Sequence, residues 1–120
     1  MSKEIKNYFE VKEICRKATS YFIGSFIEYI IDRREEWEKP QTKKIFIANF
    51  HKEFFDWDDE CTFERTQNRV NCAIRLIEHH KVEEALEYVL NSNDKKMDIQ
   101  EAKINAQETL DRLKSGELKY

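Results

Sequence analysis

The sequence predicts an all-α protein, a single domain (residues 1–120) of five or six helices packed around a buried central helix at about residues 20–38. Three observations lead to this fold class. Only two glycines and one proline occur in 120 residues, whereas the tight turns of β-sheets depend on such residues. Apolar residues recur every three or four positions, as on one face of a helix. Residues 21–31 (YFIGSFIEYII) carry one charge, so a helix there has no side suited to water.

The first helical pattern begins at Ser2 and continues into this apolar stretch without an obvious stop. Its inner face is formed by Tyr8, Val11, Cys15, Ala18 and Phe22. Thr19-Ser20 and Gly24-Ser25 are the places where a break or kink is expected, which gives two helices or one bent helix. We interpret Gly24 as a packing or kink glycine. A stretch of eleven residues falls short of the roughly 18–20 that span a bilayer, so we interpret it as a core helix.

Pro40 is expected to end the central helix, and Thr42 to cap the next one. Residues 43–57 then place a wide apolar stripe on one side: Phe46, Ile47, Phe50, Phe54 and Trp57. The central core is predicted to consist of Phe22, Phe26, Ile30, Phe50 and Phe54. His51 borders the stripe as a hydrogen-bonded edge histidine. The acidic run 56–60 lacks the glycine and the glutamate of a calcium loop, and its charges suit the N-terminus of a following helix.

Residues 62–80 form a helix with two unlike sides. The inner side is expected to contain Phe63, Val70, Ala73, Ile74 and Ile77. The outer side combines arginine with asparagine, which is uncommon on a merely solvated helix. We therefore predict a binding surface there, made of Arg65, Asn68, Arg69, Asn71 and Arg75.

The remaining chain continues the helical pattern. Residues 82–90 form a short helix, residues 91–96 a polar loop, and residues 98–114 a last helix with a narrow apolar seam. Gly116 is placed to act as the C-cap of that helix.

Charge and cysteine content limit the function classes. A net charge of −3 argues against a general nucleic-acid or membrane-surface binder, which is normally basic. Three cysteines are an odd number, and no signal-peptide pattern opens the chain, so we expect a cytoplasmic protein with reduced thiols.

No cofactor and no metal site are predicted. Cys61 and Cys72 lie about 16 Å apart along a helix, too far to share one zinc ion. Glycine-rich phosphate loops are absent from the sequence, and no cysteine has an evident histidine and acid beside it.

Residues 75–80, RLIEHH, place an arginine five positions before a histidine. This spacing resembles the signature of HEPN-type ribonucleases, small helical and often dimeric proteins. The resemblance covers six residues and implies that Arg75 and His80 act on RNA in a dimer cleft. The family's commonly polar residue after the arginine is Leu76 here. Arg75 and His80 lie about 140° apart around a helix, and His80 shares a face with Ala73 and Ile77, which predicts a half-buried structural histidine.

The sequence favours a non-enzymatic role. Our hypothesis is a small interaction protein that binds and regulates another macromolecule, as an adaptor or inhibitor; the partner is another protein, with a second copy of the chain as one candidate. The contact face is expected on the polar helix face or on an exposed aromatic edge. The alternative is a nucleic-acid-binding protein that uses the 62–80 helix, since arginine, asparagine and glutamine can hydrogen-bond to base edges. A HEPN-like ribonuclease is the less favoured alternative.

Overall fold

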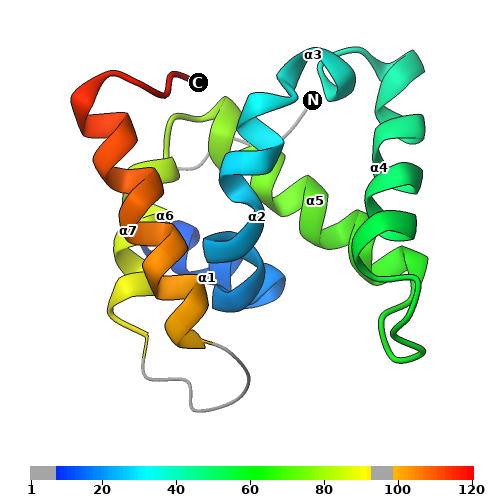
Figure 1. Cartoon of the computed structure of the whole chain (residues 1–120), viewed down its shortest axis with the longest axis horizontal. Helices are drawn as coiled ribbons and strands as arrows, with labels where there is room; N and C mark the ends of the chain where they lie inside the picture. The colour runs from blue at the N-terminus through cyan, green and yellow to red at the C-terminus, as the bar shows by residue number, and fades with distance from the viewer. Residues whose placement is uncertain (1–7, 93–98) are drawn as a thin grey trace.

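A computed structural model describes residues 8–92 and 99–120, and it confirms the all-α fold class. Seven helices occur in these residues and no strand (Figure 1): α1 (Tyr8–Ala18), α2 (Ser20–Asp32), α3 (Arg34–Trp37), α4 (Pro40–Phe54), α5 (Phe63–Glu78), α6 (Val82–Leu90) and α7 (Ile99–Ser115). The predicted start near Ser2 and most of the predicted 91–96 loop lie outside the described residues.

α2 is the buried centre of the described fold. α6 and α7 lie on one side of it and α4 on the other, while α5 passes behind it (Figure 1). Six of its thirteen residues are buried: Phe22, Ile23, Gly24, Ile27, Ile30 and Ile31. Its outer edge is tied to α7 by an ion pair of 2.6 Å between Arg112 Nη1 and Glu28 Oε1.

Breaks at Thr19 and Arg33 explain why there are more helices than the five or six predicted. Thr19 has a left-handed φ of 79°, and its hydroxyl caps α2 by accepting from the Phe22 amide at 3.2 Å. The predicted central helix of residues 20–38 ends at Asp32, and α3 follows after Arg33. Trp37 stabilises this second break, because its indole Nε1 donates to the Ile30 carbonyl at 2.7 Å, a group near the helix end.

α4 begins earlier than predicted. Thr42 is not its cap; the helix starts at Pro40, with Lys39 in extended conformation as the N-cap residue. Proline suits the first helical position because it has no amide hydrogen to leave unsatisfied there. Pro40 thus starts α4, whereas the preceding helix has already ended at Trp37.

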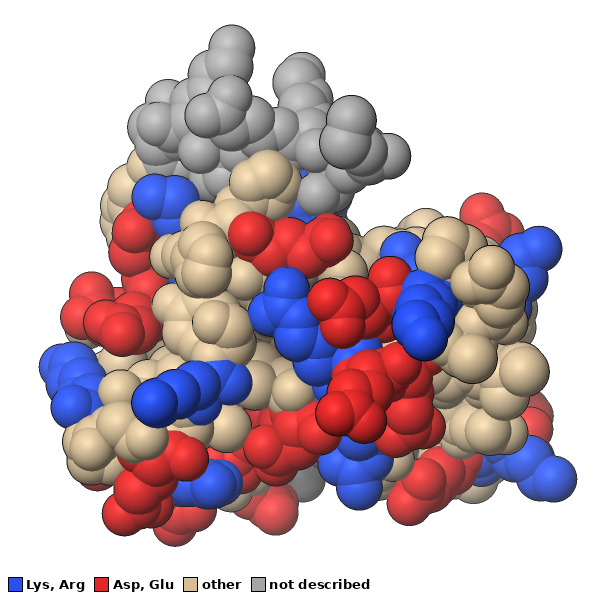
Figure 2. All heavy atoms as spheres, turned by 90° about the horizontal axis from the view of Figure 1, so that it is seen from above, with Lys and Arg blue, Asp and Glu red and all other residues tan. Residues whose placement is uncertain are grey.

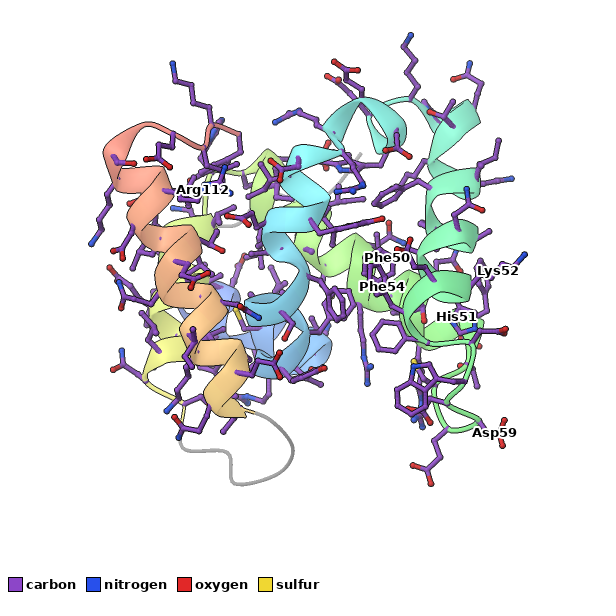
Figure 3. The ribbon with its side chains drawn as sticks, in the orientation of Figure 1. Phe50, His51, Lys52, Phe54, Asp59 and Arg112 are labelled. Atoms are coloured by element: carbon purple, nitrogen blue, oxygen red, sulfur yellow. The ribbon has the colours of Figure 1, made fainter. Side chains whose placement is uncertain are left out.

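An aromatic cluster joins α4 to α2. Phe50 and Phe54 point from α4 toward α2 (Figure 3), and the Phe26 ring lies 5.3 Å from that of Phe50 and 4.9 Å from that of Phe54. Of the predicted central core, Phe22, Ile30 and Phe50 are buried, but Phe26 and Phe54 are only half-buried. These two rings form the outer edge of the cluster.

Two aromatic residues and one histidine depart from the predicted burial. Trp57 is 78% exposed and Phe63 is 44% exposed, because α4 ends at Phe54 and α5 begins at Phe63, so neither ring lies on a continuing helical stripe. His80 is exposed, not half-buried, since α5 ends at Glu78 and His80 has a φ of 57°. By contrast, Gly116 follows the end of α7 with a φ of 87°, as predicted for its C-cap.

Candidate functional site on the polar face of α5

Capping residues set the two ends of α5. At its start the Thr62 hydroxyl accepts from the Arg65 amide at 3.2 Å. At its end the Lys81 amide donates to the Leu76 carbonyl at 2.9 Å and the His80 amide to the Ile77 carbonyl at 3.2 Å. This is a Schellman arrangement, with His80 at the left-handed position that glycine usually occupies. The helix between them buries one side and leaves the predicted binding residues on the other.

The two predicted arginines nearest the start of α5 contact the α4–α5 turn (residues 55–62). Arg65 Nη1 donates to the Glu60 carbonyl at 2.9 Å, and Arg69 Nη1 to Cys61 Sγ at 3.8 Å. Arg69 is half-buried in doing so. Both side chains therefore support the turn that precedes their own helix.

The other three predicted residues, Asn68, Asn71 and Arg75, line a groove across α5. One hollow of about 560 Å³ lies between α5 and the α3–α4 corner, and it has Trp37 and Ile74 in its lining. A second hollow of about 550 Å³ lies toward α1 and is lined by Lys17, Asn68 and Cys72. Asn71 and Arg75 line both hollows, so the structure brings these residues together at the centre of one groove.

The groove extends over α1. A third hollow of about 340 Å³ is lined by Glu10, Glu13, Ile14, Lys17 and Arg75. We call the three hollows together the α5 groove. It crosses α5 from the α3–α4 corner to α1. A groove of this extent suits a polypeptide segment better than a small molecule, which usually binds in a closed pocket.

Asn71 is the unusual residue of this groove. Its Oδ1 atom is buried and accepts no hydrogen bond within residues 8–92 and 99–120. Buried polar atoms are almost always hydrogen-bonded, and leaving one unpaired costs about 1–3 kcal/mol. Because Asn71 lines the groove, a rotation of its side chain would bring this acceptor within reach of an N–H or O–H donor on a ligand.

The charges along the groove are mixed. Four acids (Glu10, Glu13, Glu38, Glu78) line it together with three bases (Lys17, Lys43, Arg75). Viewed from the α3 side, acidic and basic side chains are also interspersed and neither sign dominates (Figure 2). A nucleic-acid backbone requires a surface on which positive charge prevails. The groove lacks that property.

A buried polar chain beneath the α4–α5 turn was not predicted from the sequence. His51 Nδ1 lies 2.7 Å from the Thr66 hydroxyl, which lies 3.6 Å from Cys61 Sγ. Thr66 is fully buried and Cys61 is 6% exposed, so substrate has no access to this thiol. The predicted edge histidine is confirmed as hydrogen-bonded. In the sequence, only the position of Thr66 among the apolar residues of the 62–80 helix pointed to these buried polar contacts.

The other two thiols are unsuited to nucleophilic chemistry. Burial raises the pKa of the Cys15 thiol from 9.0 to about 12, and the proximity of Cys72 adds to the increase. Burial also raises the pKa of Cys72, against the opposing effect of Lys17 and Arg75. Both sulfurs are therefore neutral at physiological pH, whereas nucleophilic cysteines depend on a lowered pKa.

Arg75 and His80, the pair behind the ribonuclease resemblance, have different surroundings. Arg75 lines the α5 groove, whereas the His80 ring lies past the helix end at 5.5 Å from the Tyr120 ring. Among the described residues, no group of three or more His, Cys, Asp and Glu side chains could hold a metal ion.

Within the described part of the chain, no helix combines the length and the apolar character needed to cross a bilayer. The chain matches no protein-family model, no curated protein and no solved structure.

Proposed function

We propose that this chain is a non-enzymatic interaction module that binds and regulates another protein through the α5 groove. The observation that carries the proposal is the unpaired, buried Oδ1 of Asn71, a residue that lines the middle of that groove. An unpaired buried acceptor lowers the stability of the free protein, and a partner that donates a hydrogen bond to it restores that free energy on binding. A backbone amide of a bound polypeptide is a suitable donor.

The lining of the groove supports a protein partner. Trp37 and Ile74 offer apolar surface, while Lys43 and Glu38 offer both signs of charge nearby. Protein interfaces combine an apolar centre with a polar rim in this way. The raised pKa values of the Cys15 and Cys72 thiols also fit a binding role.

The nucleic-acid alternative has less support. Of the three arginines on α5 that could contact bases or phosphates, Arg65 and Arg69 bond to the α4–α5 turn. Arg75 lies among acidic neighbours in the groove lining. Because all three cysteines are free thiols, the proposal retains the cytoplasm as the compartment.

Asn71→Leu is the decisive variant for this proposal. Leucine has a similar volume and removes the unpaired acceptor, so the free energy of unfolding should stay the same or rise by about 1 kcal/mol. Partner binding should nevertheless fall, because the donor of the partner is left unpaired. The matched control is Asn49→Leu, which makes the same change at an exposed position of α4 outside the groove.

The measurement is quantitative affinity capture from a lysate of the source cell, with nuclease treatment in a parallel sample. We expect specific proteins that wild type and Asn49→Leu both recover and that Asn71→Leu recovers at least about tenfold less. Equal recovery by all three forms would refute the proposal. Nuclease-sensitive recovery that depends on Asn71 would instead favour the nucleic-acid alternative. Sedimentation of purified wild type and Asn71→Leu shows whether the partner is a second copy.

A further inference from the structure

The α4–α5 turn displays an aromatic side chain among acids. Trp57 is 78% exposed, and Phe63, on the other side of the acids, is 44% exposed. Between these two rings the chain carries Asp58, Asp59 and Glu60, and Asp56 precedes Trp57. The dipole of α5 accounts for acids before the helix, but it does not account for a tryptophan held in water.

The turn is built to be rigid. Its backbone is closed by bonds from the Asp58 amide to the Phe55 carbonyl at 3.1 Å and from the Cys61 amide to the Asp58 carbonyl at 3.0 Å. Phe55 and Cys61 anchor it in the core, and Arg65 and Arg69 brace it from α5. The conformation of the turn is therefore fixed before any partner arrives.

Trp57 itself is also oriented. Its indole Nε1 donates to the Phe54 carbonyl at 2.9 Å, which ties the ring to the end of α4. A preoriented aromatic side chain loses little conformational freedom on binding, and tryptophan is among the residues that contribute most at protein interfaces. The exposed ring therefore has the properties of an interface anchor.

The charge around Trp57 selects the partner. None of the four carboxylates of Asp56, Asp58, Asp59 and Glu60 is in an ion pair with any residue in the described part of the chain. Asp59 lies at the tip of the turn, directed away from the helices (Figure 3). An indole face attracts a guanidinium or ammonium group, and nearby carboxylates strengthen that attraction.

We propose that the Trp57 turn (residues 56–60) is a second contact surface, which binds a lysine- or arginine-rich segment of a protein by stacking a cationic side chain on Trp57. From the proposed function it takes only that the partner is a protein; the surface and its chemistry are independent of the α5 groove. The acids neutralise the remaining charge of the bound segment, and the half-exposed Phe63 extends the apolar contact.

The test selects random 12-residue peptides, displayed on phage, against the immobilised wild-type protein at low salt. We expect the selected peptides to be enriched in Lys and Arg. Synthetic copies should bind Trp57→Ala at least about tenfold more weakly than wild type and should bind Trp57→Phe with an intermediate affinity. Asp56→Asn/Asp59→Asn should weaken binding several-fold and should flatten its salt dependence. Circular dichroism and the unfolding midpoint should be unchanged in all three variants.

Asn71→Leu separates the two surfaces in the same assay. Peptides bound at the Trp57 turn keep their affinity for Asn71→Leu. Peptides that lose affinity for Asn71→Leu and bind Trp57→Ala normally would overturn the Trp57 proposal while supporting the α5 groove. Selected peptides without an excess of basic residues, or no selected peptide at all, would also overturn it.

Discussion

Gly24 on α2 lies close to the backbone of α7, and adding one methyl group at this position tests that contact. An added Cβ at Gly24 would lie 2.6 Å from the Ala102 carbonyl oxygen and 3.1 Å from both the carbonyl carbon and the Cβ of Ala102. The nearest atom thus belongs to backbone, which cannot rotate away as a side chain can. Gly24→Ala therefore forces α2 and α7 apart.

The size of the effect follows from two opposing terms. The 2.6 Å contact is about 0.8 Å shorter than the 3.4 Å at which ordinary contacts begin, so the helices must shift by a large fraction of an ångström. Overpacking costs about 1–3 kcal/mol, and because the nearest atom is backbone we take the upper part of that range, about 2–3 kcal/mol. Alanine is a better helix former than glycine by about 1 kcal/mol, which opposes the loss. We expect a net loss of about 1–2 kcal/mol.

Urea unfolding followed by far-UV circular dichroism measures this loss. Ser25→Ala, on the neighbouring half-exposed position, is the control and should change the free energy of unfolding by less than about 0.5 kcal/mol. The double variant Gly24→Ala/Ala102→Gly removes one side-chain carbon but leaves the carbonyl oxygen, so it should restore little. A neutral or stabilising Gly24→Ala would refute the close approach, and full rescue by Ala102→Gly would assign the clash to the side chain.

Three further predictions concern the rest of the described fold. Thr19→Gly should raise the free energy of unfolding by about 1 kcal/mol in the same assay, because the left-handed strain of about 1–3 kcal/mol exceeds the few tenths lost at the cap and the added chain entropy. Phe50→Ala should lower the free energy of unfolding by about 3–5 kcal/mol, whereas Trp57→Ala should change this free energy by less than about 0.5 kcal/mol. Similar losses in both variants would contradict the burial of Phe50 and the exposure of Trp57. Because burial raises the pKa of Cys15 to about 12, the unfolded thiol loses its proton first, so stability should fall as pH rises from 9 toward 12. Cys15→Ala should flatten that pH dependence in unfolding curves, and an unchanged slope would contradict it.

The helical period predicted the fold class and most of the core but failed where helices end. Phe46, Ile47 and Phe50 are buried as the stripe of residues 43–57 predicted. Trp57 continues that period in the sequence, but α4 ends at Phe54, and Phe55 turns inward in its place. A period carries information only while the backbone stays helical, and the end of α4 is set by tertiary contacts of the turn.

The composition of the 62–80 segment indicated the polar face of α5. It did not show which of the five predicted binding residues contact the preceding turn and which line the groove. Arg65 contacts a backbone carbonyl of the preceding turn and Arg69 contacts its Cys61 sulfur. The walls of the groove come from α1 and the α3–α4 corner, far away in the sequence. The sequence placed Asn71 on the outer, polar side and did not predict that its Oδ1 would be buried with no hydrogen bond from the described residues.

This division of α5 decides which substitutions are informative. Arg65 and Arg69 of α5 bond to the α4–α5 turn, while Asn68, Asn71 and Arg75 line the α5 groove. A charge reversal at Arg69 should therefore disturb the α4–α5 turn and not the groove. A joint reversal of Arg69 and Arg75 would alter both surfaces at once, and a loss of binding could be assigned to neither. Asn71 and Trp57 each belong to one surface, and we expect substitution of either to change the free energy of unfolding little. A partner that depends on one of them, and not on the other, identifies the surface through which this fold is used.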